Sequence, residues 1–131
     1  MLKMKKVNEA MIKDVFTTSP EEEVVFAFEK LMKYKISALP VIDKSGEMVG
    51  IVTATDLGHN LVLDNYKLGT KIDNVMVKDV VSVAPENSLS DVVSLMNEGT
   101  SEGSIVNQLP VLKDNKLVGI ISDGDIIKAL K

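Results

Sequence analysis

Two stretches of the sequence are near copies of each other, and this repeated pattern decides the fold. The first copy, at residues 39–56, reads LPVIDKSGEMVGIVTATD. The second copy, at residues 109–125, reads LPVLKDNKLVGIISDGD and is one residue shorter in its turn. The segments upstream also correspond, because MIKDV (11–15) parallels MVKDV (76–80) and SPE (19–21) parallels APE (84–86). The chain therefore holds two copies of one unit of about 55 residues, with a linker near residues 65–71.

Each copy predicts the same order of elements: strand, helix, strand, strand, helix. In the first copy, residues 15–17 form a β-rich run that Pro20 stops, and strands at 39–42 and 48–52 flank a turn at 44–46. The final helices of the two copies begin near Thr55 and Asp123. The middle helices have apolar residues at helical spacing, namely Val24, Ala27, Phe28, Leu31 and Met32 in the first copy, and Leu89, Val92, Val93 and Met96 in the second.

One such unit is too small to bury a comfortable core alone. We therefore expect an α/β fold in which two β-α-β-β-α motifs pack sheet to sheet with pseudo-twofold symmetry. The first strand and the strand after the helix can share a sheet through a right-handed crossover. Residues 1–65 are expected to carry an N-terminal extension and the first motif, and residues 66–131 the linker and the second motif, together one compact module.

Composition excludes several classes of function. The 131 residues include no Cys, so disulfides, thiolate catalysis and Cys-based zinc sites are excluded. The net charge is −4 and every basic residue is Lys, which argues against nucleic-acid binding. No apolar run reaches the roughly 18 residues of a membrane span, and the N-terminus does not read as a secretion signal. We expect a cytoplasmic protein with neither a membrane nor a nucleic acid as its partner.

The candidate chemistry lies at the end of each repeat. Asp56 follows Thr53 by three positions, and Asp125 follows Ser122 in the same way. An ionised carboxylate can accept both hydroxyl hydrogens of a ribose, and a nearby helix N-terminus favours phosphate. The same spacing is also that of a helix capping box, in which the hydroxyl and the acid only cap the helix. Both interpretations are open from the residues alone, and they can coexist.

These residues resemble the cystathionine-β-synthase (CBS) domain family. The resemblance rests on ISALPVID (36–43), GIVTATDL (50–57) and GIISDGDI (119–126), and it covers about residues 7–131. It implies a stand-alone CBS domain pair, also called a Bateman module, with two clefts between its repeats. In the family such clefts commonly bind AMP, ADP or ATP, and sometimes S-adenosylmethionine. The Asp of the final motif binds the ribose, the hydroxyl three positions earlier faces phosphate, and the other repeat supplies an apolar slot for adenine.

Carried over residue by residue, the resemblance implies two sets of binding residues. One cleft would use Met11, Asp14, Phe16, Ile36, Ser37, Ser122 and Asp125. The other would use Thr53, Thr55, Asp56, Met76, Asp79, Val81, Val106 and Asn107. The second repeat has about five extra residues within 97–108, so the clefts are not expected to be equivalent. With no Arg, phosphate contacts would come from Lys13, Lys78 or backbone amides, which favours AMP over a triphosphate.

Three functions compete on this sequence. The first is a regulatory sensor of an adenine nucleotide, whose binding a partner protein or a dimer mate reads. The second is a homodimerisation or docking module with vestigial clefts. Apolar residues in the final helices favour a homodimer, namely Leu57, Leu61, Val62, Ile126, Ile127 and Leu130. The third, an enzyme, is disfavoured because no nucleophile–base pair and no metal-ligand cluster is evident. We expect no catalytic residue, no catalytic cofactor and no metal.

Overall fold

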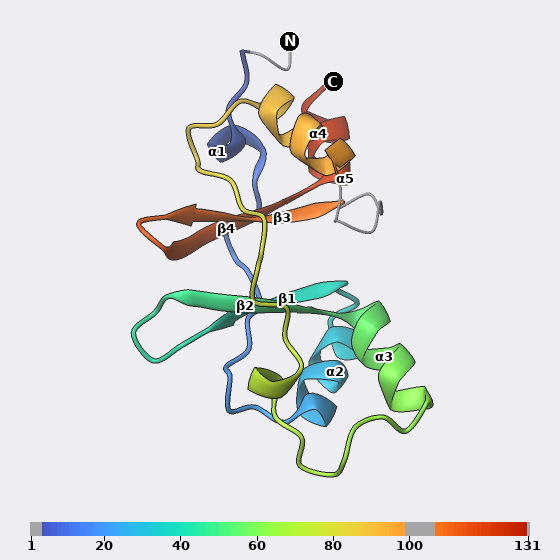
Figure 1. Ribbon diagram of the computed structural model, residues 1–131. Helices are drawn as coiled ribbons and strands as arrows, with labels where there is room; N and C mark the ends of the chain where they lie inside the picture. Colours follow the sequence, from blue (N-terminus) through green and yellow to red (C-terminus); the bar gives the residue numbers. More distant parts are fainter. Residues whose placement is uncertain (1–3, 99–106, 131) are drawn as a thin grey trace. The chain divides into compact units, whose positions relative to one another are not determined.

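The computed structural model describes residues 4–98 and 107–130, and within it the chain forms two compact units. The inner unit is Phe16–Val80. The terminal unit combines Met1–Val15 with Val81–Lys131. Each unit contains one antiparallel hairpin with its helices beside it (Figure 1). The predicted mixed α/β fold is confirmed at this level.

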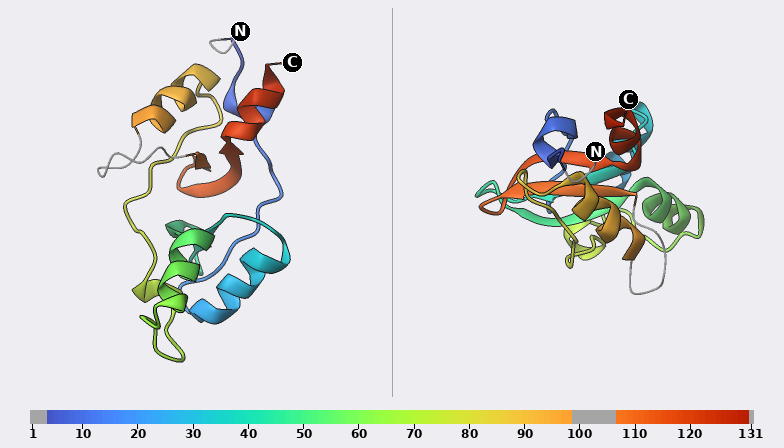
Figure 2. Two further views of the ribbon diagram at one scale, coloured as in Figure 1. Left: turned by 90° about the vertical axis from the view of Figure 1, so that its right-hand side faces the viewer. Right: turned by 90° about the horizontal axis from the view of Figure 1, so that it is seen from above.

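The inner unit is built from helix α2 (Val24–Lys33), strands β1 (Ala38–Ile42) and β2 (Met48–Thr53), helix α3 (Ala54–Val62) and the short 3₁₀ helix η1 (Ile72–Asn74). Helices α2 and α3 lie side by side against the hairpin (Figure 2). Residues from all five elements are buried together, among them Leu31, Leu39, Val52, Leu57 and Ile72. Of the predicted apolar face of α2, Met32 is the exception, because half of it is exposed.

The terminal unit is built from helices α1 (Val7–Ala10) and α4 (Leu89–Glu98), strands β3 (Gln108–Lys113) and β4 (Lys116–Ser122), and helix α5 (Asp123–Ala129). Its core gathers residues from both ends of the chain, including Val7, Leu89, Val92, Leu109, Val111 and Ile121. The N-terminal segment thus packs with the C-terminal repeat. This arrangement buries Val7 completely, because apolar residues of the C-terminal repeat cover it.

The predicted first strand of each repeat is reduced to a single parallel bridge. Thr18, not residues 15–17, pairs with Val41, and Val83 pairs with Val111 in the second repeat. Thr18 donates to the Pro40 carbonyl at 3.0 Å, and its own carbonyl accepts from Ile42 at 2.9 Å. The next parallel bonds in either direction would need an N–H from Pro40 or Pro20, which proline lacks. The parallel direction expected of a crossover is nevertheless present.

The same obstacle recurs in the second repeat. There Val83 donates to the Pro110 carbonyl at 3.1 Å, and Leu112 donates back to Val83 at 2.9 Å. The bonds that would lengthen this ladder need N–H groups from Pro110 and Pro85. The four prolines of the chain therefore limit both parallel pairings to one residue pair, and leave two-stranded sheets.

The two repeats exchange a short segment between the compact units. Ile12 of the first repeat bridges Ile120 on β4, and Val77 of the second repeat bridges Ile51 on β2. The preceding methionines, Met11 and Met76, lie over glycines of these strands. Because of this exchange, the compact units do not coincide with the sequence repeats. The boundary predicted near residue 65 separates the two repeats and not the two compact units.

Within residues 4–98 and 107–130, no helix combines the length and the apolar character that a membrane crossing requires.

Candidate functional site

The predicted ribose-binding acids both lie in the first turn of a helix that directly follows a strand. Thr53 caps α3, and its hydroxyl accepts from the Asp56 amide at 3.2 Å. Ser122 caps α5, and its hydroxyl accepts from the Asp125 amide at 3.2 Å. The helix starts expected near Thr55 and Asp123 are confirmed to within one residue. Both hydroxyls therefore act as helix caps.

The two carboxylates are held in different ways. Asp125 accepts from the Ser122 amide and from the Ser122 hydroxyl, each at 2.9 Å, which completes a capping box. Asp56 is exposed, and its carboxylate accepts instead from the Asn60 side chain at 3.4 Å. The capping interpretation thus applies in full to Asp125 and only to the hydroxyl half of the pair at Asp56.

The terminal unit holds four further predicted site residues. Met11 lies against β4, where its sulfur would be 2.7 Å from a Cβ placed on Gly119. Asp14 and Val81 are exposed. The carbonyl of Asn107 accepts from the Asp123 amide at 3.0 Å, beside the start of α5. Met11 and Asn107 are therefore in the same unit as Asp125, while Val106 lies outside the described residues.

The inner unit holds the remaining predicted site residues. Thr55 and Asp79 are exposed, and Met76 lies over Gly50 of β2. Ser37 parallels Asn107, because its carbonyl accepts from the Ala54 amide at 2.8 Å at the start of α3. The other members predicted for this unit are half-buried Ile36 and half-exposed Phe16. The residues predicted for each cleft are therefore divided between the two compact units.

An aromatic pair was not predicted from the sequence. Phe16 stacks on Tyr34, with ring centroids 4.3 Å apart and an angle of 17° between the planes. Each residue is 44% exposed, so the pair offers an apolar edge to solvent. The Lys33 ammonium lies 5.3 Å from the Tyr34 ring centroid. No local signal links Phe16 to Tyr34, because the fold brings together the segments before and after α2.

A second group missed by sequence reasoning surrounds Asp56. Asn60 lies one helical turn along α3 and donates to the Asp56 carbonyl at 2.8 Å, as well as approaching its carboxylate. Tyr66, in the linker, has its pKa raised by partial burial and by the negative charge of Asp56, while hydrogen bonding to the Asn60 side chain lowers this pKa. Helical spacing could have suggested Asn60, whereas Tyr66 depends on how the linker folds back.

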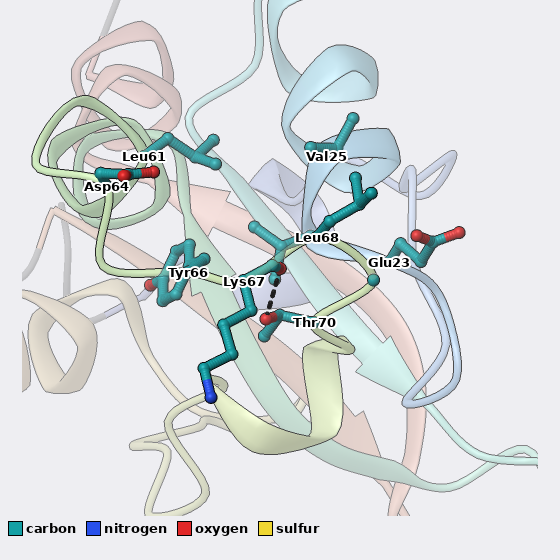
Figure 3. A pocket seen from close by; sticks show the side chains of 10 residues that line it. Glu23, Val25, Leu61, Asp64, Tyr66, Lys67, Leu68 and Thr70 are labelled. Carbon is teal, nitrogen blue, oxygen red and sulfur yellow. Dashed lines mark hydrogen bonds between the residues drawn. The ribbon is translucent and has the colours of Figure 1, made fainter.

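The linker also forms a pocket of about 250 Å³ with the first turn of α2 (Figure 3). Its walls include Val24, Val25, Leu61, Tyr66 and Leu68. Figure 3 shows Tyr66 on the same loop as Lys67 and Thr70, whose hydroxyl donates to the Lys67 carbonyl at 2.7 Å. In the described part of the chain, no three His, Asp or Glu side chains lie close enough to hold a metal ion.

The family model for the CBS domain matches residues 7–62 and again residues 72–131. The chain belongs to the CBS domain family. The two matched segments correspond to the two sequence repeats, so the chain is a CBS domain pair, as the repeated LPV and GI motifs indicated.

Three similar proteins illustrate the range of this CBS domain pair's relatives. Inosine-5′-monophosphate dehydrogenase of Methanocaldococcus jannaschii is 37% identical over 98% of this chain, but the chain spans only about a quarter (24%) of that enzyme's length. CBSX2 of Arabidopsis thaliana, solved in complex with AMP, is 27% identical with a TM-score of 0.80, and the match covers 96% of each chain. The CBS domain pair of MJ0100, in complex with 5′-methylthioadenosine and S-adenosyl-L-methionine, is 25% identical with a TM-score of 0.82, covering 97% of this chain and all (100%) of that one.

Proposed function

We propose that this CBS domain pair is a non-catalytic regulatory module that binds an adenine nucleotide, with AMP as the favoured ligand. The observation that carries the proposal is the doubled pairing of a capping hydroxyl with an acid in the first turn of a helix, at Thr53 with Asp56 and at Ser122 with Asp125. A single pair would be explained by helix capping alone. Asp56 lacks the reciprocal cap bond, so its acid is free of that role.

The chemistry of the Asp56 site suits a nucleoside phosphate. The exposed carboxylate can accept hydrogen bonds from both hydroxyls of a ribose. Amides at the start of α3 and the helix dipole favour a phosphate group nearby. Because the chain has no Arg, the phosphate would depend on these amides and on Lys78. A monophosphate carries the least negative charge for them to neutralise.

The relatives support an adenosine-type ligand without selecting one. CBSX2 is known in complex with AMP, and the MJ0100 pair with 5′-methylthioadenosine and S-adenosyl-L-methionine. These ligands share a ribose, which the two acids would bind, and an adenine, which the apolar slots would hold. S-adenosylmethionine, ADP and ATP are therefore the alternatives that the experiment below has to separate from AMP.

We further propose that each cleft combines the acid of one repeat with an apolar slot of the other, with Phe16, Ile36 and Ser37 serving Asp125. The stacked and half-exposed ring of Phe16 is suited to an adenine face. Val81 and Asn107 would serve Asp56 in the same way. Ligand binding would then favour one arrangement of the repeats, which a dimer mate or another protein reads.

Homodimerisation is the second candidate function, and exposed apolar residues on the final helices favour it. Val62 is 86% exposed on α3, and Ile127 is 62% exposed on α5. Light scattering at micromolar concentration tests this directly. A dimer mass that falls to the monomer in a Val62→Asp and Ile127→Asp double variant supports the interface, and a monomeric wild type contradicts it.

The ligand proposal is tested by calorimetric titration of the purified chain with AMP, ADP, ATP and S-adenosylmethionine in turn. We expect saturable heat with AMP, with one binding event lost in Asp56→Ala and the other in Asp125→Ala. Asp73→Ala is the matched control, because Asp73 is an exposed acid in η1 outside both sites. Phe16→Ala should weaken the same event as Asp125→Ala if the clefts pair as proposed. The absence of heat with all four ligands would leave the docking module as the function.

A further inference from the structure

The two repeats offer an internal comparison of how their acids are supported. Asp56 and Asp125 occupy equivalent positions, and the residue four places further on is Asn60 in the first repeat but Ala129 in the second. In the second repeat the acid turns back onto Ser122. In the first repeat the Asn60 side-chain nitrogen lies 3.4 Å from the acid, and it donates to the Asp56 backbone carbonyl at 2.8 Å. The difference in sequence therefore accompanies a difference in the environment of the acid.

Asn60 is fixed from the linker side as well. The Asn65 side chain donates to the Asn60 side-chain oxygen at 2.9 Å, and the Asn65 amide donates to the Asn60 carbonyl at 2.9 Å. The amide nitrogen of Asn60 is thereby left to face Asp56. Tyr66 is the next residue in the linker, and burial and the negative charge of Asp56 raise its pKa.

The linker that carries Tyr66 packs against a different element. Residues 64 and 66–70 share the walls of a pocket with Glu23, Val24 and Val25 at the start of α2 (Figure 3). Gly69 adopts a left-handed conformation with φ of 84°, and the Thr70 carbonyl accepts from the Val24 amide at 2.8 Å. A change at Asp56 can thus reach α2 through Asn60, Asn65 and the linker that carries Tyr66, all within the inner unit.

We propose that Asn60 and Tyr66 are positioning residues for the Asp56 carboxylate, and that they report occupancy of the Asp56 site to the linker. This inference rests on the proposed nucleotide-binding function. Ribose hydroxyls that donate to Asp56 use acceptor positions of the carboxylate that Asn60 leaves open, and they reduce its effective charge beside Tyr66. In the described part of the second repeat, Ala129 takes the place of Asn60 and has no side-chain amide to donate to Asp125, so the two sites signal differently even when they hold the same ligand.

The test uses AMP in an Asp125→Ala background, so that the Asp56 site is measured alone. Asn60→Ala, which copies the second repeat, should weaken AMP binding about three- to tenfold, because a hydrogen bond that orients a charged acceptor is lost. Tyr66→Phe should weaken it about twofold. His59→Ala is the matched control, because His59 is an exposed neighbour on the same helix, and its affinity for AMP should be unchanged.

A second readout separates positioning from a general loss of structure. The chain has two tyrosines, so carbon-13 labelling of the phenol carbon gives two signals, which Tyr34→Phe assigns. Without ligand, Asn60→Ala should shift the Tyr66 signal and leave that of Tyr34 in place. As AMP is added, the chemical shift of Tyr66 should change in proportion to the saturation measured by calorimetry. Asn60→Ala should remove most of that change.

The outcomes distinguish the inference from the proposed function. The inference would be overturned if calorimetric binding of AMP were lost in Asp56→Ala but unaltered in Asn60→Ala and Tyr66→Phe, and if the Tyr66 signal did not move. Nucleotide binding would then still stand. If calorimetry detected no binding of AMP to any of these proteins, AMP binding itself would be contradicted. If Asn60→Ala left the Tyr66 signal unchanged in the ligand-free protein, the proposed route would be overturned without reference to any ligand.

Discussion

Replacing Gly50 by alanine should destabilise the fold, because a backbone segment crosses directly over this strand position. A Cβ on Gly50 would lie 2.7 Å from the Met76 sulfur and 2.8 Å from the Val77 carbonyl oxygen, whereas ordinary contacts begin at 3.4 Å. The methionine can move, but the carbonyl cannot easily do so. It accepts from the Ile51 amide at 3.0 Å, and the Val77 amide donates back to Ile51 at 3.0 Å.

The expected cost follows from this geometry. Inserting a methyl group into a closely packed site costs about 1–3 kcal/mol, and the stiff carbonyl puts this case near the upper end. Alanine also restricts the unfolded chain, which returns about 0.7 kcal/mol. The free energy of unfolding should therefore fall by about 2 kcal/mol, and Tm by roughly 6–8 °C for a chain of this size.

The assay is thermal and urea unfolding of Gly50→Ala beside Gly124→Ala. Gly124 lies in α5, where an added Cβ would meet only the Ser122 hydroxyl, at 3.6 Å, so alanine there should stabilise the protein by about 0.5 kcal/mol. Adding Met76→Ala to Gly50→Ala should relieve the sulfur contact only. A Tm for Gly50→Ala within about 2 °C of the wild type, or full rescue by Met76→Ala, would refute the argument from the carbonyl.

Three further predictions concern the acids, the linker tyrosine and the core. Asp125→Ala should lower the free energy of unfolding, measured in urea, by about 1 kcal/mol because it breaks the capping box with Ser122. Asp56→Ala should change it by less than half as much, and equal losses would contradict the difference between the sites. The pKa of Tyr66 is raised by burial and by Asp56, so its stabilising contribution is present below the unfolded-state pKa and is lost as pH rises through the folded-state pKa. With Tyr34→Phe as the background, near-ultraviolet titration should show a lower Tyr66 pKa when Asp56→Asn is added. An unchanged Tyr66 pKa would exclude the effect of the Asp56 charge. Leu31→Ala should cost about 2–5 kcal/mol by calorimetry because Leu31 has no exposed surface, and a loss below about 1 kcal/mol would mean that the site collapses around the cavity.

The hairpins and the helix starts were accessible from the sequence because local geometry fixes them. Gly46 has a φ of 87° in the first turn, and Asp114 and Asn115 have φ of 51° and 66° in the second, values that such turn residues tolerate. The first strands were overestimated, although the prolines that shorten them are visible in the sequence. Their effect emerges only when Thr18 is paired with Val41 in a known register.

The sequence by itself determined the repeat, the order of middle helix, hairpin and final helix in each copy, the membership of the CBS family and the positions of the two acids at helix starts. These features depend on spacings of a few residues, over which hydrogen bonding and side-chain periodicity are local. The structure showed which of two local contacts each acid makes, because Asp125 closes a capping box while Asp56 faces Asn60. Only the tertiary structure decided that Phe16 stacks on Tyr34 across α2 and that the linker brings Tyr66 back to α3. Contacts between distant segments depend on which surfaces the whole chain can bury together, and no short stretch of sequence records that choice.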